Sequence, residues 1–105
     1  MTVATLPIDP ALAERFSTLS AEWKRDTVLL SSTSALIAHP AYQAIIALGP
    51  AVVPLLLRDL EREPTHWFEA LQAITGEDPV PRQQCGRIQA MTEAWLAWGR
   101  SRSLI

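Results

Sequence analysis

Apolar residues recur at helical spacing over the first third of the chain. Between residues 10 and 31 they follow one another at steps of three or four positions, with charged residues mostly in between. This spacing predicts a single amphipathic helix over roughly residues 10–31, capped by Asp9 and started by Pro10 at its first position. The stripe expected to face the core comprises Leu12, Phe16, Leu19, Trp23, Thr27 and Leu30.

The segment from His39 to Leu60 predicts two short helices divided at Gly49-Pro50. Glycine accepts the positive φ that ends a helix, and proline at a first helical position gives up an N–H that has no partner there. We therefore expect helices over about 40–48 and 51–63, folded back on each other, with Pro54 bending the start of the second. One face of this second helix carries Val52, Val53, Leu56, Leu57 and Leu60, and another carries Arg58, Asp59, Arg62 and Glu63.

Caps and turn residues divide the rest of the chain. The hydroxyls of residues 31–34 end the first helix and cap a short one that runs to about residue 38, and His39 before Pro40 turns the chain and can cap the next helix. Thr65 is expected to cap a helix that Gly76 closes. The last helix should run from about 84 or 86 to 100, with residues 101–105 frayed. Its predicted apolar face comprises Ile88, Met91, Trp95 and Trp98.

An internal repeat appears when the chain is shifted by about 26 positions. Tyr42 then falls on Phe68, Ile45 on Leu71 and Leu48 on Ile74, and both helices lead through a proline-containing turn into a second apolar helix. A helix–turn–helix unit used twice is typical of an α-solenoid. The stretch 49–57 resembles the turn and second helix of a HEAT-like repeat, and residues 70–76 followed by 95–98 resemble the closing unit of such an array.

The resemblance to HEAT-like repeats covers residues 40–98 and implies an all-α fold: a right-handed stack of two HEAT-like helical hairpins with an N-terminal capping helix. The chain would be one helical domain with a tail over 1–8, a helical cap over 10–38, and hairpins over 40–63 and 65–100. HEAT-like arrays usually have three or more units, so either the helix over 10–31 caps the stack or a second chain completes it. The stretches 39–42 and 67–68 also resemble a small bacterial family of uncharacterised proteins, from which no activity carries over.

Composition narrows the class of protein. The chain has 105 residues, a net charge of −2 and one cysteine, Cys85, so it forms one domain without an internal disulfide. No apolar run approaches the ~18 residues that span a bilayer, and the N-terminus lacks the pattern of a signal peptide. We therefore expect a cytoplasmic protein with no membrane partner. Eight of the nine basic residues are arginine, which suits an interface, but the codon usage of a high-GC genome explains this bias better.

Residues that could carry chemistry are few. His39 and His66, the only imidazoles, do not combine with Cys85 into the spacing of a metal site, and no metal or cofactor is predicted. Ser31, Ser32 and Ser34 lie near His39, but capping explains them better than nucleophilic catalysis does. Glu77-Asp78 is expected to be a solvated turn. No catalytic residue is therefore assigned.

Four tryptophans in a chain of this length are an excess. Trp23 and Trp95 fall on predicted core stripes, and Trp67 can be counted with the apolar set of the helix after Thr65. Trp67 and Trp98 are also the candidates for exposure, and an exposed tryptophan beside arginine is typical of an interface. We therefore expect a non-catalytic protein–protein interaction, scaffold or regulatory module of HEAT-like type. Its partner would be another protein or a second copy of the chain, and its partner-binding residues would be Arg58, Arg62, Trp67 and Trp98.

Two alternatives stay open from the sequence. The first is a nucleic-acid-associated accessory protein that uses Arg82, Arg87, Arg100 and Arg102, although the net negative charge argues against nucleic acid as a partner. The second is an enzyme with a site centred on His39 and the hydroxyls of residues 31–34.

Overall fold

The computed structural model describes residues 10–30 and 32–105, and this part of the chain is helical without strands. The expected all-α class is confirmed there, whereas the expected tail over 1–8, the Asp9 cap and Ser31 lie outside it. The helices are α1 (Pro10–Thr27), α2 (Thr33–Ala38), α3 (Pro40–Ala47), α4 (Val53–Arg62), α5 (Phe68–Thr75) and α6 (Ile88–Ser101), with short 3-10 turns η1 (Pro50–Val52) and η2 (Arg82–Gln84).

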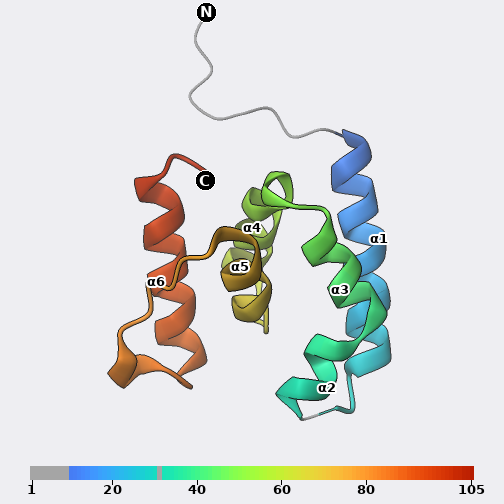
Figure 1. The fold of residues 1–105 in the computed structure, drawn as a ribbon, viewed down its shortest axis with the longest axis horizontal. Coiled ribbons are helices and arrows are strands. Elements are labelled where there is room, and N and C mark those ends of the chain that lie inside the picture. The colour runs from blue at the N-terminus through green and yellow to red at the C-terminus, as the bar shows by residue number, and fades with distance from the viewer. Residues whose placement is uncertain (1–9, 31) are drawn as a thin grey trace, which may run out of the picture.

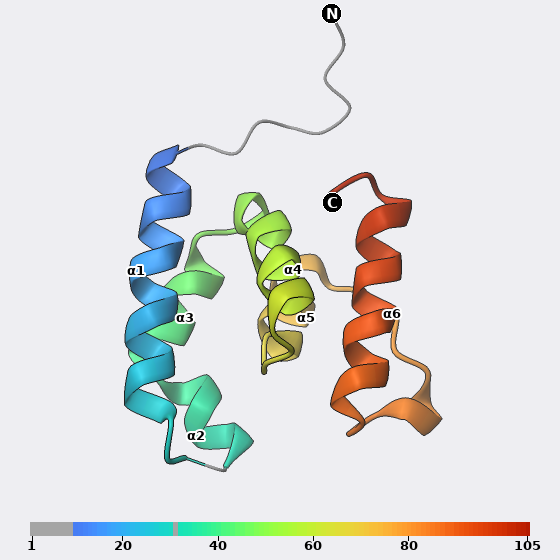
Figure 2. The same ribbon diagram turned by 180° about the vertical axis from the view of Figure 1, so that it is seen from behind.

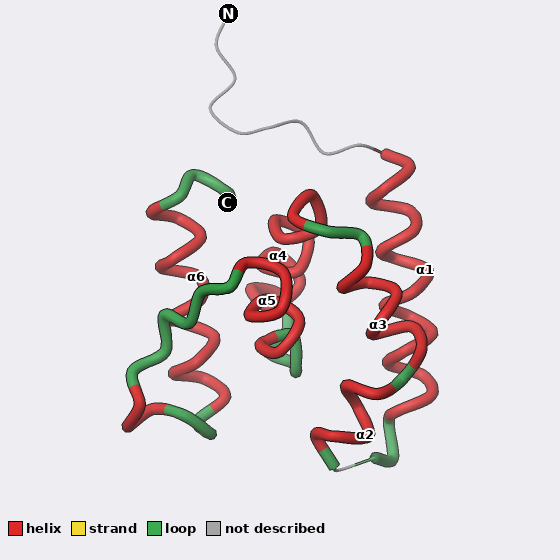
Figure 3. Tube along the Cα trace, viewed as in Figure 1, coloured by secondary structure: helices red, strands yellow, loops and turns green. Residues whose placement is uncertain are grey.

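The helices form three neighbouring groups (Figure 1). Helix α1 lies along α3, with α2 at one end of this pair; α4 and α5 occupy the middle, and α6 lies on the far side. The view from behind shows the same order (Figure 2). Helix α3 packs on α5 and α4 packs on α6, while a long loop leads from α5 to α6 (Figure 3). Successive pairs of helices are therefore layered along one direction.

Helix α1 ends at Thr27, earlier than the predicted residue 31. The Thr27 hydroxyl donates to the Trp23 carbonyl at 2.6 Å, and a turn closed by the Leu30 N–H on the Thr27 carbonyl follows. Ser32, in an extended conformation, caps α2 by accepting from the Ala35 N–H, so the chain must leave the first helix before it. Leu30 consequently lies on the surface and is not part of the core stripe.

An aromatic cluster joins α1, α3 and the start of α5. The ring centroid of Trp67 lies 4.6 Å from that of Trp23, 5.5 Å from that of Tyr42 and 5.7 Å from that of Phe16. Each polar atom of the three amphipathic rings has a partner: Trp23 donates to the Leu36 carbonyl, Trp67 to Asp59 and Tyr42 to the His66 carbonyl. Buried aromatic rings of this kind supply large apolar contact and need these partners for their N–H and O–H groups.

Tyr42 also provides the N-terminal cap of α5. Its hydroxyl accepts from the Ala70 N–H at 2.9 Å, the donor at the third helical position that a serine or threonine cap normally satisfies. The predicted cap, Thr65, is wrong: α5 begins at Phe68, and Trp67, whose side chain makes no capping bond, holds the cap position. Burial raises the pKa of Tyr42 far above its ordinary value, although the bond from Ala70 opposes the rise, so the hydroxyl stays protonated and both donates and accepts.

Removal of the Tyr42 hydroxyl gives the first prediction. Tyr42→Phe keeps the ring in the aromatic cluster but leaves the buried Ala70 N–H and the His66 carbonyl without this partner. We expect the free energy of unfolding to fall by about 1–2 kcal/mol, because an unsatisfied buried donor costs its desolvation. Urea unfolding followed by circular dichroism measures this change in the free energy of unfolding. A variant as stable as the wild type would show that the hydroxyl does not act as the cap.

The turn between α3 and α4 follows the predicted chemistry, but it bends the chain by 104°, so the two helices make few contacts with each other and are not folded back as predicted. Gly49 has a φ of +83°, and Pro50 opens the 3-10 turn η1, so that α4 itself begins only at Val53. Pro54 therefore lies at the very start of α4, where its missing N–H costs little. The apolar face predicted for this segment is buried as expected: Val52, Val53, Leu56, Leu57 and Leu60.

Helix α6 keeps part of its predicted face and departs from its predicted end. Trp95 is buried and Met91 and Trp98 pack against the core, whereas Ile88 is exposed. Thr92, Leu96 and Gly99 are also buried. A Cβ at Gly99 would lie 2.6 Å from the Leu57 side chain, so glycine allows α6 to approach α4 closely. Residues 101–105 are not frayed: the Ser103 and Leu104 N–H groups bond to the Arg100 and Gly99 carbonyls, which is a Schellman closure with Ser103 at φ +59°.

Within the described residues, no single helix is both long and apolar enough to cross a membrane, and only the pair Pro40–Ala47 and Pro50–Arg62, bent by 104°, has the length and composition when taken together.

Candidate partner-binding groove

An open groove of about 490 Å³ lies between α1 and α4. We call it the α1–α4 groove. Helix α1 contributes apolar, hydroxyl and basic side chains, and α4 contributes apolar, basic and acidic ones from the opposite side. Residues three and four positions apart lie on one face of a helix, so each helix presents one continuous face to the groove. The lining residues are Phe16, Ser17, Ser20, Ala21 and Lys24 from α1, and Leu55, Arg58, Asp59 and Arg62 from α4.

A buried carboxylate holds the floor of the groove together. Asp59 Oδ2 accepts from Lys24 Nζ at 2.8 Å and from Trp67 Nε1 at 2.7 Å, and Oδ1 accepts from the Arg62 guanidinium at 2.9 Å. We call Lys24, Asp59, Arg62 and Trp67 the Asp59 cluster. It joins α1, α4 and the residue before α5 through one side chain. The sequence placed Asp59 among the charged residues of α4, but it is buried because three donors satisfy its two oxygens.

The Asp59 cluster controls the charge of that carboxyl. Burial alone would raise the pKa of Asp59, but the hydrogen bonds from Lys24 and Trp67, the positive charge of Lys24 and the hydrogen bond from Arg62 outweigh burial and hold it below its ordinary value. Asp59 is therefore ionised at neutral pH. It offsets much of the positive charge of Lys24 and Arg62, and it fixes Arg62 at the edge of the groove.

Arg58 differs from the other two cations of the groove. It is exposed, and it makes no ion pair with any residue of the described chain. It also lines a second groove, of about 390 Å³, with Glu61, Arg62, Arg100 and Ile105. The predicted pair Arg58 and Arg62 is thus brought together at the surface, one helical turn apart, and of the two only Arg58 has its guanidinium unengaged by another described residue.

The two tryptophans predicted to be at the interface lie in different surroundings. Trp67 is 0 % exposed, so the prediction that it belongs to a binding surface is wrong: it completes the aromatic cluster, and its indole N–H bonds to Asp59. Trp98 is half-buried, packs edge-on against Trp95 at 5.2 Å and carries the Arg102 guanidinium over its ring at 5.0 Å. Trp98 therefore reaches the surface only in part and lies on α6, away from the residues of the α1–α4 groove.

The arginines of the nucleic-acid alternative do not form one free basic patch. Arg100 pairs with Glu61 at 3.3 Å and Arg102 with Glu77 at 3.5 Å. Arg82 and Arg87 are exposed near the loop before α6. Two of the four are thus partly neutralised by carboxylates.

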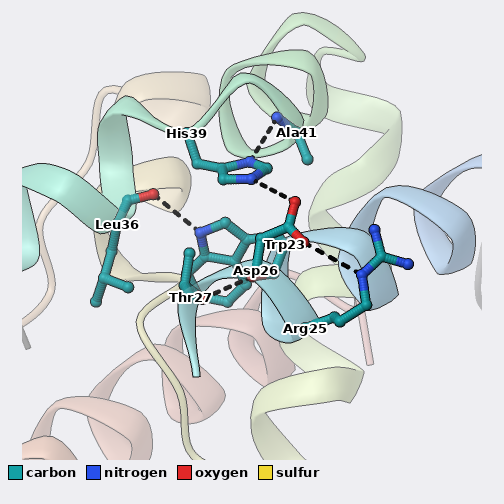
Figure 4. A network of polar contacts seen from close by, with 7 residues as sticks. All are labelled: Trp23, Arg25, Asp26, Thr27, Leu36, His39 and Ala41. Carbon is teal, nitrogen blue, oxygen red and sulfur yellow. Dashed lines mark hydrogen bonds and ion pairs between the residues drawn. The ribbon is translucent and has the colours of Figure 1, made fainter. Parts of the chain in front are cut away.

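His39 caps α3, as the sequence predicts. Its Nδ1 accepts from the Ala41 N–H at 3.0 Å, and its Nε2 lies 3.0 Å from Asp26 Oδ2 (Figure 4). Accepting at Nδ1 places the proton of the neutral ring on Nε2, which then donates to Asp26. The hydrogen bond from His39, and then that from Arg25, lower the pKa of Asp26. Both ring nitrogens are thus engaged by groups other than a hydroxyl, which favours the structural role.

Clusters that could hold a metal ion are absent from residues 10–30 and 32–105. Cys85 is exposed in the turn after η2. Glu77 pairs with Arg102, and Asp78 accepts from the Val80 N–H, so the expected solvated turn is also tied to α6. His66, the second imidazole residue of the chain, accepts the hydrogen bond of the Tyr42 hydroxyl with its backbone carbonyl.

Sequence reasoning found Arg58 and Arg62 but missed the rest of the groove. The helical spacing puts Lys24 among the charged residues outside the apolar stripe of the first helix, and it marks the hydroxyl of Ser20 only as a possible break in that helix. A signal for Asp59 was present, because it follows Leu56 by three positions and so shares its buried face. The opposing wall on α1 had no local signal, because Lys24 and Asp59 are separated by 35 residues.

Comparison of the chain with protein-family models, with curated proteins and with solved structures found no match.

Proposed function

We propose that the protein is a non-catalytic interaction module of HEAT-like type that binds a partner protein through the α1–α4 groove. The observation that carries the proposal is the exposed pair Arg58 and Arg62 at the rim of an open groove that also has apolar walls. Arginine beside buried apolar surface is the composition of protein interfaces. Such a groove gives a partner both a site for apolar side chains and a directional ionic contact.

The packing of the helices supports the HEAT-like part of the proposal. Two stacked hairpins place their first helices against each other and their second helices against each other. Helix α3 packs on α5, and α4 packs on α6, in agreement with the repeat found at a shift of about 26 residues, although α4 is turned by 104° from α3. Helix α1, packed along α3, would then be the cap of the stack.

Charge reversal at Arg58 tests the proposed function. Arg58→Glu should abolish capture of a stoichiometric partner from a lysate of the native host, because it replaces a free cation at the groove by an anion. The fold should survive, since glutamate four residues before Arg62 forms a favourable helical pair worth about 0.2–0.5 kcal/mol. The measurement is a tagged pull-down with mass spectrometry, with light scattering to detect self-association.

Arg82→Glu is the matched control, because it makes the same change of charge at an exposed residue outside the groove. A partner retained by the wild type and by Arg82→Glu but lost by Arg58→Glu supports the proposal. No partner for the wild type together with a monomeric protein would contradict it, and a partner that Arg58→Glu still captures would move the binding surface elsewhere.

A further inference from the structure

We propose that the α1–α4 groove recognises an acidic peptide segment of its partner, in which a side-chain carboxylate binds Arg58 and a neighbouring apolar side chain packs on Phe16 and Leu55. This inference rests on the proposed function and deepens it by naming the chemistry of the bound segment. A carboxylate is the group that the planar guanidinium of arginine binds best in two-point geometry.

The charge of the groove is the first argument. Three cations and one carboxylate line it, Lys24, Arg58 and Arg62 against Asp59, so the groove has a net charge of +2 on a chain whose net charge is −2. Asp59 already engages Lys24 and Arg62, and Glu63 beside the groove lies 3.9 Å from Lys24, so the uncompensated charge centres on Arg58. Complementarity therefore requires a partner that brings negative charge to that side chain.

The Ser20 hydroxyl offers a ligand a second polar contact. Ser20 lines the groove, and its hydroxyl makes no hydrogen bond to the described residues, so it is open to a ligand in the groove. A carboxylate, with two acceptor oxygens, can accept from Ser20 or from Arg58 without needing to donate.

The apolar walls of the groove and the small number of its cations favour a peptide over nucleic acid as the ligand. Phe16 and Leu55 line the same groove as the cations, whereas a nucleic-acid site requires a track of cations spaced to follow successive phosphates. Beyond the groove, Arg100 is paired with Glu61, which interrupts such a track. A peptide with an acidic residue next to an apolar one complements both the cationic and the apolar side chains of the groove.

The test uses short random peptides displayed on phage and selected on the full-length wild-type protein. Selected sequences are synthesised with a fluorescent label, and their dissociation constants are measured by anisotropy, each beside a counterpart with Asn and Gln in place of Asp and Glu. We expect Asp or Glu next to a large apolar residue to be enriched. Arg58→Glu should weaken binding by about tenfold or more, because a charge-assisted hydrogen bond is lost, and Ser20→Ala should weaken it less.

Arg82→Glu serves again as control and should bind as the wild type does, while circular dichroism checks that each variant is folded. The inference is overturned if no peptide is selected, if the enriched peptides are not acidic, or if Arg58→Glu binds them as tightly as the wild type. Displacement of the peptide by a single-stranded RNA oligonucleotide that binds more tightly would assign the groove to nucleic acid instead. A partner captured from a lysate without any acidic peptide selection would retain the proposed function and reject this inference.

Discussion

Trp67→Ala should cause the largest loss of stability of any single substitution considered. Trp67 is fully buried, contacts the rings of Phe16, Trp23 and Tyr42, and donates its indole N–H to Asp59. Truncation of a buried tryptophan to alanine costs about 3–5 kcal/mol, a large part of the 5–15 kcal/mol that stabilises a typical domain. Urea unfolding followed by far-ultraviolet circular dichroism measures the change without depending on tryptophan fluorescence.

Two further variants separate the contributions of Trp67. Trp67→Phe keeps an aromatic ring but loses the N–H group that donates to Asp59. Its free energy of unfolding should therefore lie between that of the wild type and that of Trp67→Ala. Trp98→Ala, at a half-buried position with Arg102 over its ring, should cost less than Trp67→Ala. A Trp67→Ala protein that is as stable as the wild type but no longer captures a partner would show instead that Trp67 is a partner-binding residue, as the sequence predicts.

The sequence predicts those parts of the fold that follow from local periodicity. The buried face of α4, the glycine turn at Gly49 and the end of α5 at Gly76 all depend on residues within a few positions of each other. The His39 cap belongs to the same class, because its bond to the Ala41 N–H spans two residues. Spacing and turn chemistry are sufficient for such features.

What the sequence does not predict depends on contacts between distant segments. The cap of α5 comes from Tyr42, 28 residues before Ala70, so the search for a local cap led to Thr65. The burial of Trp67 has no local signal either, because the residues that cover it lie on α1, α3 and α4. The α1–α4 groove exists only once α1 packs beside α3 and α4, and a residue such as Ser20 acquires significance from that packing alone.

Asp59→Ala should have the second largest effect, a loss of about 2–3 kcal/mol. It leaves the buried indole N–H of Trp67 without an acceptor, which costs about 1–3 kcal/mol. Lys24 and Arg62 also lose their counter-charge. Their side chains are 31 % and 79 % exposed, so water can solvate the two positive charges. The cost should therefore stay below the 3–5 kcal/mol of a fully enclosed broken ion pair. A fall of about 10 °C in Tm, measured by calorimetry, corresponds to it.

Asp59→Asn isolates the charge of this residue, because the amide keeps an acceptor for Trp67. The pKa of Asp59 lies below its ordinary value in the folded chain, so the unfolded chain takes up the proton first on acidification. Its contribution to stability is complete above the unfolded pKa of about 3.9 and is lost as the pH falls through the lower folded pKa. Wild-type protein should therefore lose stability more steeply than Asp59→Asn below about pH 4. Asp26, whose pKa is also lowered, titrates in both proteins and cancels from the difference. Parallel acid curves for the two proteins would mean that Lys24, Arg62 and Trp67 do not favour the ionised form of Asp59.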